Sequence, residues 1–280
     1  MGTIVQLGTN VPGSLLNRRV GIKWLWSACG NCYACAAGNP QHCPHQHNTS
    51  RTKYGTLQEY AIALADFVTL IPDSLKPEIV APLLCAGLTL AGAVSKIDHL
   101  EPGSSVVILG SGGGLGHLGV QIARHKGYSV IAVDAGVEKG ELSLSSGSAH
   151  YIDYTNTDVV ARVKELTGND GAHAVIIVSG AEDAFMQAPK LVRNTGTLVI
   201  VGLPRNDFHL PLSPTEVSAR GLVIQGASVG TETDMDMLLE LAAQGILVPH
   251  IEVVPFEEVP NVFTKLLTQD VVGRYVVRVS

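Results

Sequence analysis

The chain has 280 residues, which is more than one typical domain and fewer than three, so its length favours two domains. Lysine and arginine total 19 against 25 aspartates and glutamates, giving a net charge of −6. This balance argues against a protein that binds nucleic acid or an acidic membrane through a basic face. Hydrophobic residues make up 46% and charged residues 16%, so the chain is not disordered and can build a core.

The first ten residues do not resemble a secretion signal, because no basic stretch precedes an apolar one. The longest apolar stretch, residues 79–94, is interrupted by proline and glycine and falls short of the ~20 residues of a membrane-spanning helix. We therefore expect buried core there, no membrane partner and a cytoplasmic protein. Five cysteines in such a chain indicate metal binding or catalysis before disulfides.

Residues 1–86 form a first region with an irregular pattern. Turn residues separate short β-like runs at 3–7, 20–25, 57–61 and 67–71. All but one of the cysteines lie in this region. We expect a mostly β domain here.

Residues 87–226 form a second, rhythmic region in which short apolar runs alternate with helical stretches. Strands are predicted at 105–109, 129–133, 174–178, 197–201 and 222–225, and helices at 115–125, 138–146, 158–166 and 181–192. Continuous apolar strands that alternate with helices indicate a parallel sheet covered on both faces. Right-handed crossovers then give a doubly wound α/β sheet. Residues 227–280 add predicted helices at 235–244 and 259–267 and a closing strand at 274–279.

Four cysteines cluster in the first region, at Cys29, Cys32, Cys35 and Cys43. Cys-x-x-Cys steps bring sulfurs to one tetrahedral centre, and the longer loop returns the fourth, as in a closed structural zinc site. A disulfide pairing fits a cytosolic chain poorly, and an iron–sulfur cluster stays open as an alternative. The spacing predicts zinc.

A glycine-rich turn follows the first strand of the second region directly. Its residues are Gly110, Gly112, Gly113, Gly114, Leu115 and Gly116, and a helix comes next. Glycines there allow a tight turn and let backbone N–H groups approach a pyrophosphate at the helix N-terminus. The position between strand and helix predicts a dinucleotide site.

The next predicted strand ends in an acid, Asp134, 18 residues after Gly116. A carboxylate there accepts hydrogen bonds from ribose hydroxyls and repels a 2′-phosphate, which favours NAD over NADP. The alternative is that Asp134 only caps the following helix. Lys139 adds a second candidate ribose contact, although a solvated surface lysine fits it nearly as well.

The combination of these motifs resembles the yeast-type zinc alcohol dehydrogenases of the medium-chain dehydrogenase/reductase superfamily. The similarity runs through the cysteine cluster, the glycine turn, Asp134 and the segments 21–25, 58–60, 84–87 and 272–276. It implies an incomplete GroES-like catalytic domain over 1–86, a Rossmann domain over 87–226, and a return to the catalytic domain over 227–280. It also implies zinc and NAD as cofactors, small alcohols and aldehydes as substrates, and a homo-oligomer, either a dimer or a tetramer.

Three further residues gain a role from the resemblance alone. Cys85 matches the later cysteine ligand of the family's catalytic zinc. The alternative is that Cys85 is only a small buried hydrophobic residue of the core. Trp24 matches a wall of the pocket for short alcohols, and Arg274 matches a contact to a coenzyme phosphate.

The resemblance also implies a departure. Residues 1–8 resemble the segment just after the family's Gly-His-Glu motif, so roughly 70 upstream residues with the other catalytic zinc ligands have no counterpart here. The sequence therefore predicts an NAD-dependent alcohol dehydrogenase by descent, with a catalytically silent zinc- and NAD-binding remnant as the alternative. A zinc-independent quinone reductase is disfavoured by Cys85 and the cysteine cluster. The acidic charge disfavours a nucleic-acid zinc module.

Overall fold

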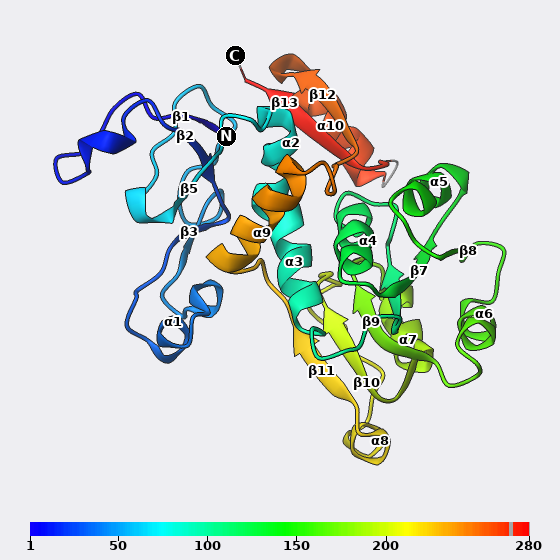
Figure 1. Ribbon diagram of the computed structural model, residues 1–280. Helices are drawn as coiled ribbons and strands as arrows, with labels where there is room; N and C mark the ends of the chain where they lie inside the picture. Colours follow the sequence, from blue (N-terminus) through cyan, green and yellow to red (C-terminus); the bar gives the residue numbers. More distant parts are fainter. Residues whose placement is uncertain (269–270, 280) are drawn as a thin grey trace. The chain divides into compact units, whose positions relative to one another are not determined.

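The computed structural model describes residues 1–268 and 271–279, and the chain divides into two compact units (Figure 1). Unit 1 comprises Met1–Leu88 and Val229–Ser280, and unit 2 comprises Thr89–Ser228. The boundaries expected from the sequence, after residues 86 and 226, lie two residues from these. The chain thus leaves unit 1 once, builds unit 2, and returns.

Unit 2 is built on a six-stranded sheet in the order β11-β10-β9-β6-β7-β8, in which every neighbouring pair is parallel (Figure 1). The order runs outward from β6 in both directions, which is the arrangement of the doubly wound fold. The expected fold class is confirmed. The strands are β6 (Ser105–Leu109), β7 (Ser129–Asp134), β8 (His150–Asp153), β9 (Ala172–Ile177), β10 (Val192–Ile200) and β11 (Val223–Gly226).

The central strand β6 shows why the sheet has two covered faces. Val106 and Ile108 are fully buried on one face, and Val107 and Leu109 are buried on the other, so the strand reads as an unbroken apolar run. Val107 and Leu109 belong to a core cluster that includes Phe185, whose ring lies 5.7 Å from that of Phe208. Burial on both faces fixes the strand's position in the sheet.

The first helix of unit 2 precedes β6, and each later helix follows one of the strands β6 to β10. The helices are α3 (Leu88–Ser95), α4 (Gly116–His125), α5 (Val137–Ser145), α6 (Val159–Leu166), α7 (Glu182–Leu191) and α8 (Pro214–Arg220). Side chains cap two of them, because Asp158 accepts a hydrogen bond from Ala161 N and Ser213 accepts one from Glu216 N. These caps set where α6 and α8 begin.

Unit 1 has smaller sheets. β1 (Gly2–Thr3), β2 (Arg19–Ile22) and β5 (Val68–Leu70) form an antiparallel sheet, and β3 (Leu25–Ser27) pairs with β4 (His47–Asn48). Lys23, which is 4% exposed, donates to Thr69 and forms an ion pair with Glu232. This pair joins the two parts of the chain that make up unit 1.

The remaining elements of unit 1 are mostly helical. They are α1 (Tyr33–Ala36), α2 (Pro77–Pro82), the π-helical segment η4 (Leu83–Gly87), α9 (Glu232–Ala243), α10 (Val259–Leu267) and short 3₁₀ turns, with the parallel pair β12 (Ile251–Pro255) and β13 (Arg274–Arg278). A capping box formed by Thr231 and Asp234 starts α9. Gly87 lies against Leu238 of α9, so η4 and α9 pack closely.

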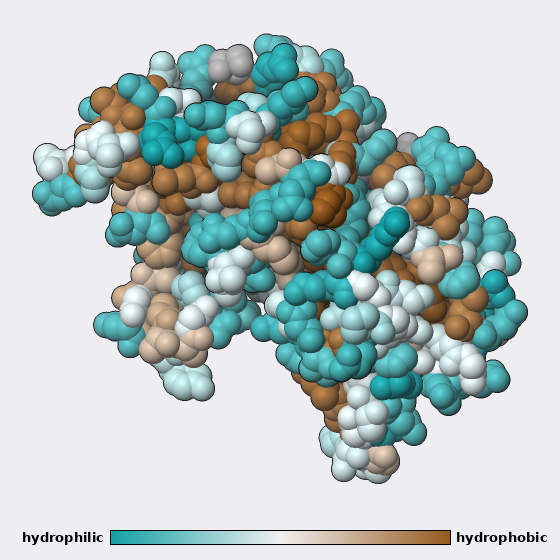
Figure 2. Space-filling view, viewed as in Figure 1, coloured by the Kyte–Doolittle hydropathy of each residue, from teal (hydrophilic) through white to brown (hydrophobic). Residues whose placement is uncertain are grey.

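Apolar side chains reach the surface of unit 1. Figure 2 shows hydrophobic residues over the strands β1, β2 and β5. Tyr54, Tyr60 and Ile62, in the irregular segment between β4 and β5, are 92%, 76% and 88% exposed. Large side chains exposed to this extent are typical of surfaces that contact other protein segments.

One helical run, Pro77–Ser95, is long and apolar enough to cross a membrane by length and composition, with a mean hydropathy of 1.7. In the structure 67% of its apolar window is buried, which is also typical of a core helix. The expectation of buried core at residues 79–94 agrees with this burial.

Several elements differ from the sequence expectations. The run 57–61 is irregular, and its large side chains are exposed, so the strand predicted there was wrong. Strands β8 and β12 and helix α8 were not predicted. The short strands β8 and β12 have few buried residues and form only through partners distant in the chain.

Candidate functional site

The glycine turn lies at the carboxyl edge of the unit 2 sheet. β6 ends at Leu109, Gly110 adopts a φ of +89°, and α4 begins at Gly116. Gly110 N donates to Val133 O at 2.8 Å, which ties the turn to β7. Parallel strands place ligand sites at this edge, outside their carboxyl ends.

Two glycines of the turn have no room for a side chain. A Cβ on Gly116 would lie 2.0 Å from Gly110 O, and one on Gly112 would lie 2.4 Å from Cβ of Lys139. A Cβ on Gly113 would meet only Gly110 O, at 3.6 Å, which is an ordinary contact. Gly116 and Gly112 therefore close the turn against its own backbone and α5. Gly113, with Gly114 and Leu115, forms the part of the turn that leads into α4.

Asp134 lies at the carboxyl end of β7, beside the turn. It is 6% exposed, and its carboxylate accepts from Gly112 N and Ala135 N, both at 2.8 Å. Lys139 Nζ lies 3.6 Å from the same carboxylate. The structure thus brings together the glycine turn, the acid and the lysine singled out from the sequence. Asp134 does not cap α5, whose N-cap is Gly136.

Buried polar residues that the sequence reasoning missed hold the turn in place. Ser111 Oγ and Ser143 Oγ lie 2.8 Å apart, and Ser143 also donates to Lys139 O. His117 is fully buried in the first turn of α4, with Nδ1 2.8 Å from Gly113 O. A histidine and serines flanking a glycine run were visible in the sequence, but their burial depends on the packing of α4 and α5.

These residues fit a dinucleotide. The α4 N-terminus and the turn offer backbone N–H groups for a pyrophosphate, and the Asp134 carboxylate is positioned at the strand end where a ribose is bound. Because Gly116 and Gly112 have no side chains, the turn packs closely on itself and on α5, and its backbone stays accessible to a ligand.

The four clustered cysteines converge in unit 1. Their Sγ atoms all lie within 4.8 Å of one another, and those of Cys43 and Cys29 are 3.5 Å apart. Cys32 occupies the N-cap position of α1, and Cys43, 1% exposed, closes the lobe. Zinc–thiolate bonds of about 2.3 Å place tetrahedral sulfurs about 3.8 Å apart, so the group fits one zinc ion.

The electrostatics of this lobe also suit a metal. A hydrogen bond from the backbone of Asn31 lowers the pKa of Cys29 to about 6, whereas burial and the neighbouring thiols raise the pKa of Cys35 to about 12. Four adjacent thiols cannot all ionise without a cation between them. Backbone N–H groups of Cys29 and His45 point at Cys43 Sγ, at 3.5 and 3.3 Å, which stabilises thiolate charge.

Cys85 lies apart from the lobe, in the π-helical segment η4 of unit 1. Its side chain reaches solvent, and desolvation by surrounding protein raises the pKa of its thiol while the Arg274 charge opposes this effect. Arg274 begins β13. Trp24 is half-buried between β2 and β3, and Gly21 of β2 packs against Leu84, next to Cys85. Both Cys85 and Arg274 belong to unit 1.

Among residues 1–268 and 271–279, the cysteine lobe is the one group of three or more metal-binding side chains. A catalytic zinc requires three protein ligands and an open position. Cys85 belongs to no such group within this part of the chain, so the residues described do not fit a catalytic zinc centre.

Comparison with known proteins gives a consistent result. Residues 1–73 match the family of alcohol dehydrogenase GroES-like domains, and residues 114–244 match the zinc-binding dehydrogenase family. An alcohol dehydrogenase from Geobacillus stearothermophilus is 39% identical over 100% of this chain and 81% of its own length. One from Schizosaccharomyces pombe is 35% identical over 100% of this chain and 79% of its own.

Solved structures agree. An alcohol dehydrogenase from the hyperthermophilic archaeon Aeropyrum pernix superposes with a TM-score of 0.91 at 29% sequence identity, covering 99% of this chain and 80% of the other. The GroES-like match lies within unit 1. The zinc-binding dehydrogenase match begins in unit 2 and extends into α9 of unit 1. The chain spans about four fifths of the length of these relatives.

Proposed function

Because this chain belongs to the zinc-type medium-chain alcohol dehydrogenases, a family of oxidoreductases, we propose that it oxidises small primary and secondary alcohols with NAD. The observation that carries the coenzyme choice is the Asp134 carboxylate, held beside the glycine turn by two backbone N–H groups. Zinc and NAD are the cofactors of this proposal.

The residues of unit 2 bind and orient the coenzyme. N–H groups at the start of α4 would face the pyrophosphate, and the Asp134 carboxylate would accept hydrogen bonds from the ribose hydroxyls. Because Asp134 is almost fully buried, a 2′-phosphate beside its carboxylate would meet charge repulsion in a partly desolvated place. Bound NAD supplies the acceptor for the hydride that leaves the alcohol.

The residues of unit 1 have two tasks. Cys29, Cys32, Cys35 and Cys43 would hold a structural zinc, which keeps the lobe folded. By the family resemblance, Cys85 would be one ligand of a catalytic metal, Trp24 a wall of the substrate pocket and Arg274 a contact to a coenzyme phosphate. The bulk of an indole at Trp24 favours short alcohols.

The test is a steady-state assay that follows NADH formation from ethanol, 2-propanol and a longer alcohol, together with a Cys85→Ser variant. Alcohol-dependent reduction of NAD that Cys85→Ser abolishes would support the proposal. Turnover that is unaffected by Cys85→Ser would contradict the role of this thiol, and turnover with NADP alone would contradict the role of Asp134.

One observation favours a second candidate. Within the described residues the metal-binding side chains form a single group, the cysteine lobe. This fits a chain that binds zinc and NAD without oxidising alcohols. NADH binding with one zinc per chain and no alcohol turnover in the same assay would favour this candidate.

Location and assembly complete the proposal. None of the five cysteines, all among the described residues, forms a disulfide, and four are suited to zinc, which supports a reducing compartment such as the cytoplasm. Exposed apolar residues on unit 1, such as Tyr54 and Ile62, suit association of copies into a dimer or tetramer. Light scattering on the purified chain measures its mass in solution and so tests whether it forms a dimer or a tetramer.

A further inference from the structure

The end of strand β8 lies beside the coenzyme site. β7 and β8 pair in parallel, and their register places Asp134 opposite Asp153, so both acids end their strands at the carboxyl edge of the sheet. Tyr154 N donates to Asp134 O at 3.1 Å, which continues the pairing one residue further. Side chains at the end of β8 are therefore close to the turn that follows Asp134.

Two side chains of β8 hold one residue of that turn, Gly136. The Tyr151 hydroxyl donates to Gly136 O at 2.8 Å, and the Asp153 carboxylate accepts from Gly136 N at 3.1 Å. Tyr151 and Asp153 are two residues apart on a strand, so their side chains leave the same face of the sheet. Gly136 has a φ of +80° and is the N-cap of α5. We call Tyr151 and Asp153 the β8 clamp, because they fix both backbone polar groups of the residue where α5 begins.

Both residues of the β8 clamp are themselves held in place. The Asp153 carboxylate also accepts from Thr155 Oγ1 at 2.7 Å and Thr155 N at 2.9 Å, and these hydrogen bonds lower the pKa of Asp153. Burial and the neighbouring carboxylates of Asp153 and Asp134 raise the pKa of Tyr151, so its hydroxyl keeps the proton that it donates. The ring of Tyr151 lies against Gly140 of α5, where a Cβ would come within 2.6 Å of Cε1. Tyr151 therefore supports the first turn of α5 through its hydroxyl and its ring.

The residue that the clamp holds lies between the two side chains assigned to the ribose. Ala135 N, one residue before Gly136, donates to the Asp134 carboxylate at 2.8 Å. Lys139, three residues after Gly136, has its Nζ 3.6 Å from the same carboxylate. The distance between the Asp134 carboxylate and the Lys139 ammonium therefore depends on where α5 begins.

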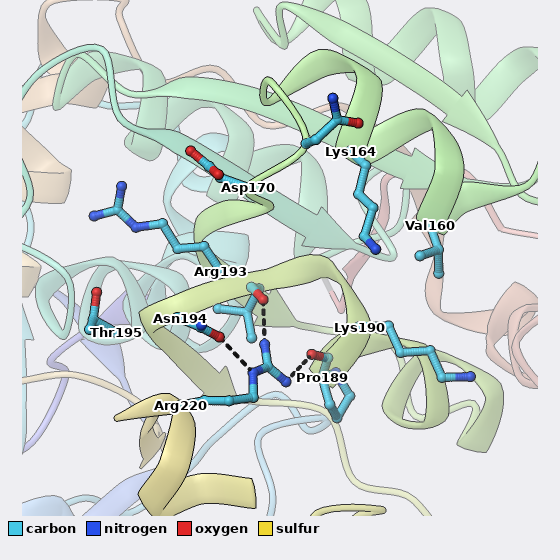
Figure 3. A pocket seen from close by; sticks show the side chains of 11 residues that line it. Val160, Lys164, Asp170, Pro189, Lys190, Arg193, Asn194, Thr195 and Arg220 are labelled. Atoms are coloured by element: carbon cyan, nitrogen blue, oxygen red, sulfur yellow. Dashed lines mark hydrogen bonds between the residues drawn. The ribbon is translucent and has the colours of Figure 1, made fainter.

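A different group joins the elements at the opposite edge of the sheet. Figure 3 shows Arg220 of α8, whose guanidinium donates at 2.9, 2.6 and 3.1 Å to Pro189 O, Val192 O and Asn194 Oδ1. Val192 is the first residue of β10, and the strands are parallel, so these bonds lie at the amino edge. Arg220 therefore stabilises unit 2 away from the coenzyme site and offers a comparison for the β8 clamp.

We propose that Tyr151 and Asp153 are positioning residues for the coenzyme, which hold Gly136 so that Asp134 and Lys139 keep the arrangement that favours NAD over NADP. This inference rests on the coenzyme choice in the proposed function and adds two residues that do not themselves contact the coenzyme. A carboxylate discriminates against a 2′-phosphate only while it is held beside the ribose, because a displaced carboxylate loses its hydrogen bonds to the hydroxyls and weakens the repulsion. Loosening the clamp should therefore weaken NADH binding more than NADPH binding.

The test is calorimetric titration of the chain and its variants with NADH and with NADPH. The double variant Tyr151→Phe, Asp153→Ala should bind NADH at least about fivefold more weakly and narrow the ratio of the two dissociation constants at least about threefold. Asp153→Ala alone should show part of this effect. Asp153→Asn keeps an oxygen that accepts from Gly136 N, so its ratio should stay within about twofold of the wild-type ratio.

Two controls separate positioning from a general loss of stability. Tyr128→Phe removes a hydroxyl that donates to Ile97 O at 2.9 Å, the same kind of bond as that of Tyr151, and Arg220→Gln removes the hydrogen bonds at the amino edge. Both should lower the melting temperature and change the ratio of dissociation constants by less than about twofold. A control that narrows the ratio as much as the double variant would assign the effect to stability and overturn the proposal.

Hydrogen exchange tests the structural link without coenzyme. The amides of Gly112 and Ala135, which donate to the Asp134 carboxylate, should exchange faster in the double variant than in the wild type. Unchanged exchange at both amides would contradict the link between the β8 clamp and Asp134.

The titrations also separate this inference from the proposed function. Equal affinities of the wild type for NADH and NADPH would overturn both. A wild type that prefers NADH, with a double variant that keeps this preference in full, would overturn the role of the β8 clamp alone and leave the assignment of Asp134 intact.

Discussion

The cysteine lobe of unit 1 and the sheet of unit 2 are held together by different means. In the sheet, the β6 residues Val106 to Ile108 are fully buried, and helices cover both faces. In the lobe, α1 contains no buried residue, and Tyr33 is 90% exposed, yet four sulfurs converge. Burial therefore specifies the fold of unit 2, whereas metal ligation specifies the fold of the lobe.

The largest effect is expected from breaking the lobe. Cys32→Ser removes one of four thiolates, so the bound zinc should fall from about one per chain to nearly none. Structural zinc contributes about 10–16 kcal/mol of apparent binding free energy, which leaves little to hold the lobe without it. Metal analysis and native-state hydrogen exchange measure the result.

A matched control uses the other thiol. Cys85→Ser should leave the zinc content unchanged, since Cys85 belongs to no group of three ligands in the described chain. Amides of β6 and β9 should stay protected in both variants. Loss of protection in the sheet on zinc removal would show that the two regions are not independent.

Truncating a core side chain tests whether burial stabilises unit 2. Phe185→Ala empties a site that is 2% exposed in the unit 2 core, so the free energy of unfolding should fall by about 3–5 kcal/mol. Tyr33→Ala in the lobe removes an exposed ring and should change the free energy of unfolding by less than about 0.5 kcal/mol. Urea unfolding followed by circular dichroism compares them, and similar losses for both would refute the distinction.

A smaller effect is expected in the glycine turn. Gly116→Ala places a Cβ 2.0 Å from a backbone oxygen and should destabilise unit 2 by about 1–3 kcal/mol while weakening NADH binding. Gly113→Ala meets an ordinary contact at 3.6 Å, so its melting temperature should stay close to that of wild type. Equal destabilisation by the two substitutions would be inconsistent with the geometry of the turn.

The smallest effect concerns pH. Burial and the charge of Arg193 lower the pKa of His173, which accepts a hydrogen bond from Ser105 N through Nδ1. The unfolded chain therefore takes up a proton more readily than the folded one, and stability should decline as the pH falls below about 6.5. His173→Asn keeps a hydrogen-bond acceptor but does not titrate in this range. The urea concentration at the unfolding midpoint should therefore change less between pH 7.5 and 5.5 than it does in the wild type. An equal pH dependence of the urea midpoint in the variant and the wild type would exclude His173 as the cause of the loss of stability.

The coenzyme unit was largely predictable from the sequence because its signals are local. The apolar run of β6, the glycines after it and Asp134 at the end of β7 lie within one strand–turn–helix–strand unit. The start of α8 also had a local signal, Ser213 three residues before Glu216, which was overlooked. Local sequence signals predict structure best where buried residues are also close together along the chain.

Contacts between distant residues could not be predicted. The ion pair of Lys23 and Glu232 joins residues 209 positions apart, and β12 pairs in parallel with β13 across α10. Tertiary packing, not local pattern, positions these groups.

The most direct test of the account is the coenzyme preference of the wild-type chain. Titration calorimetry with NADH and with NADPH should show at least about tenfold tighter binding of NADH, equivalent to ~1.4 kcal/mol or more, because Asp134 repels a 2′-phosphate. Asp134→Ala should narrow this ratio. Equal affinities for the two coenzymes in the wild type, or a ratio unchanged by Asp134→Ala, would contradict the assignment.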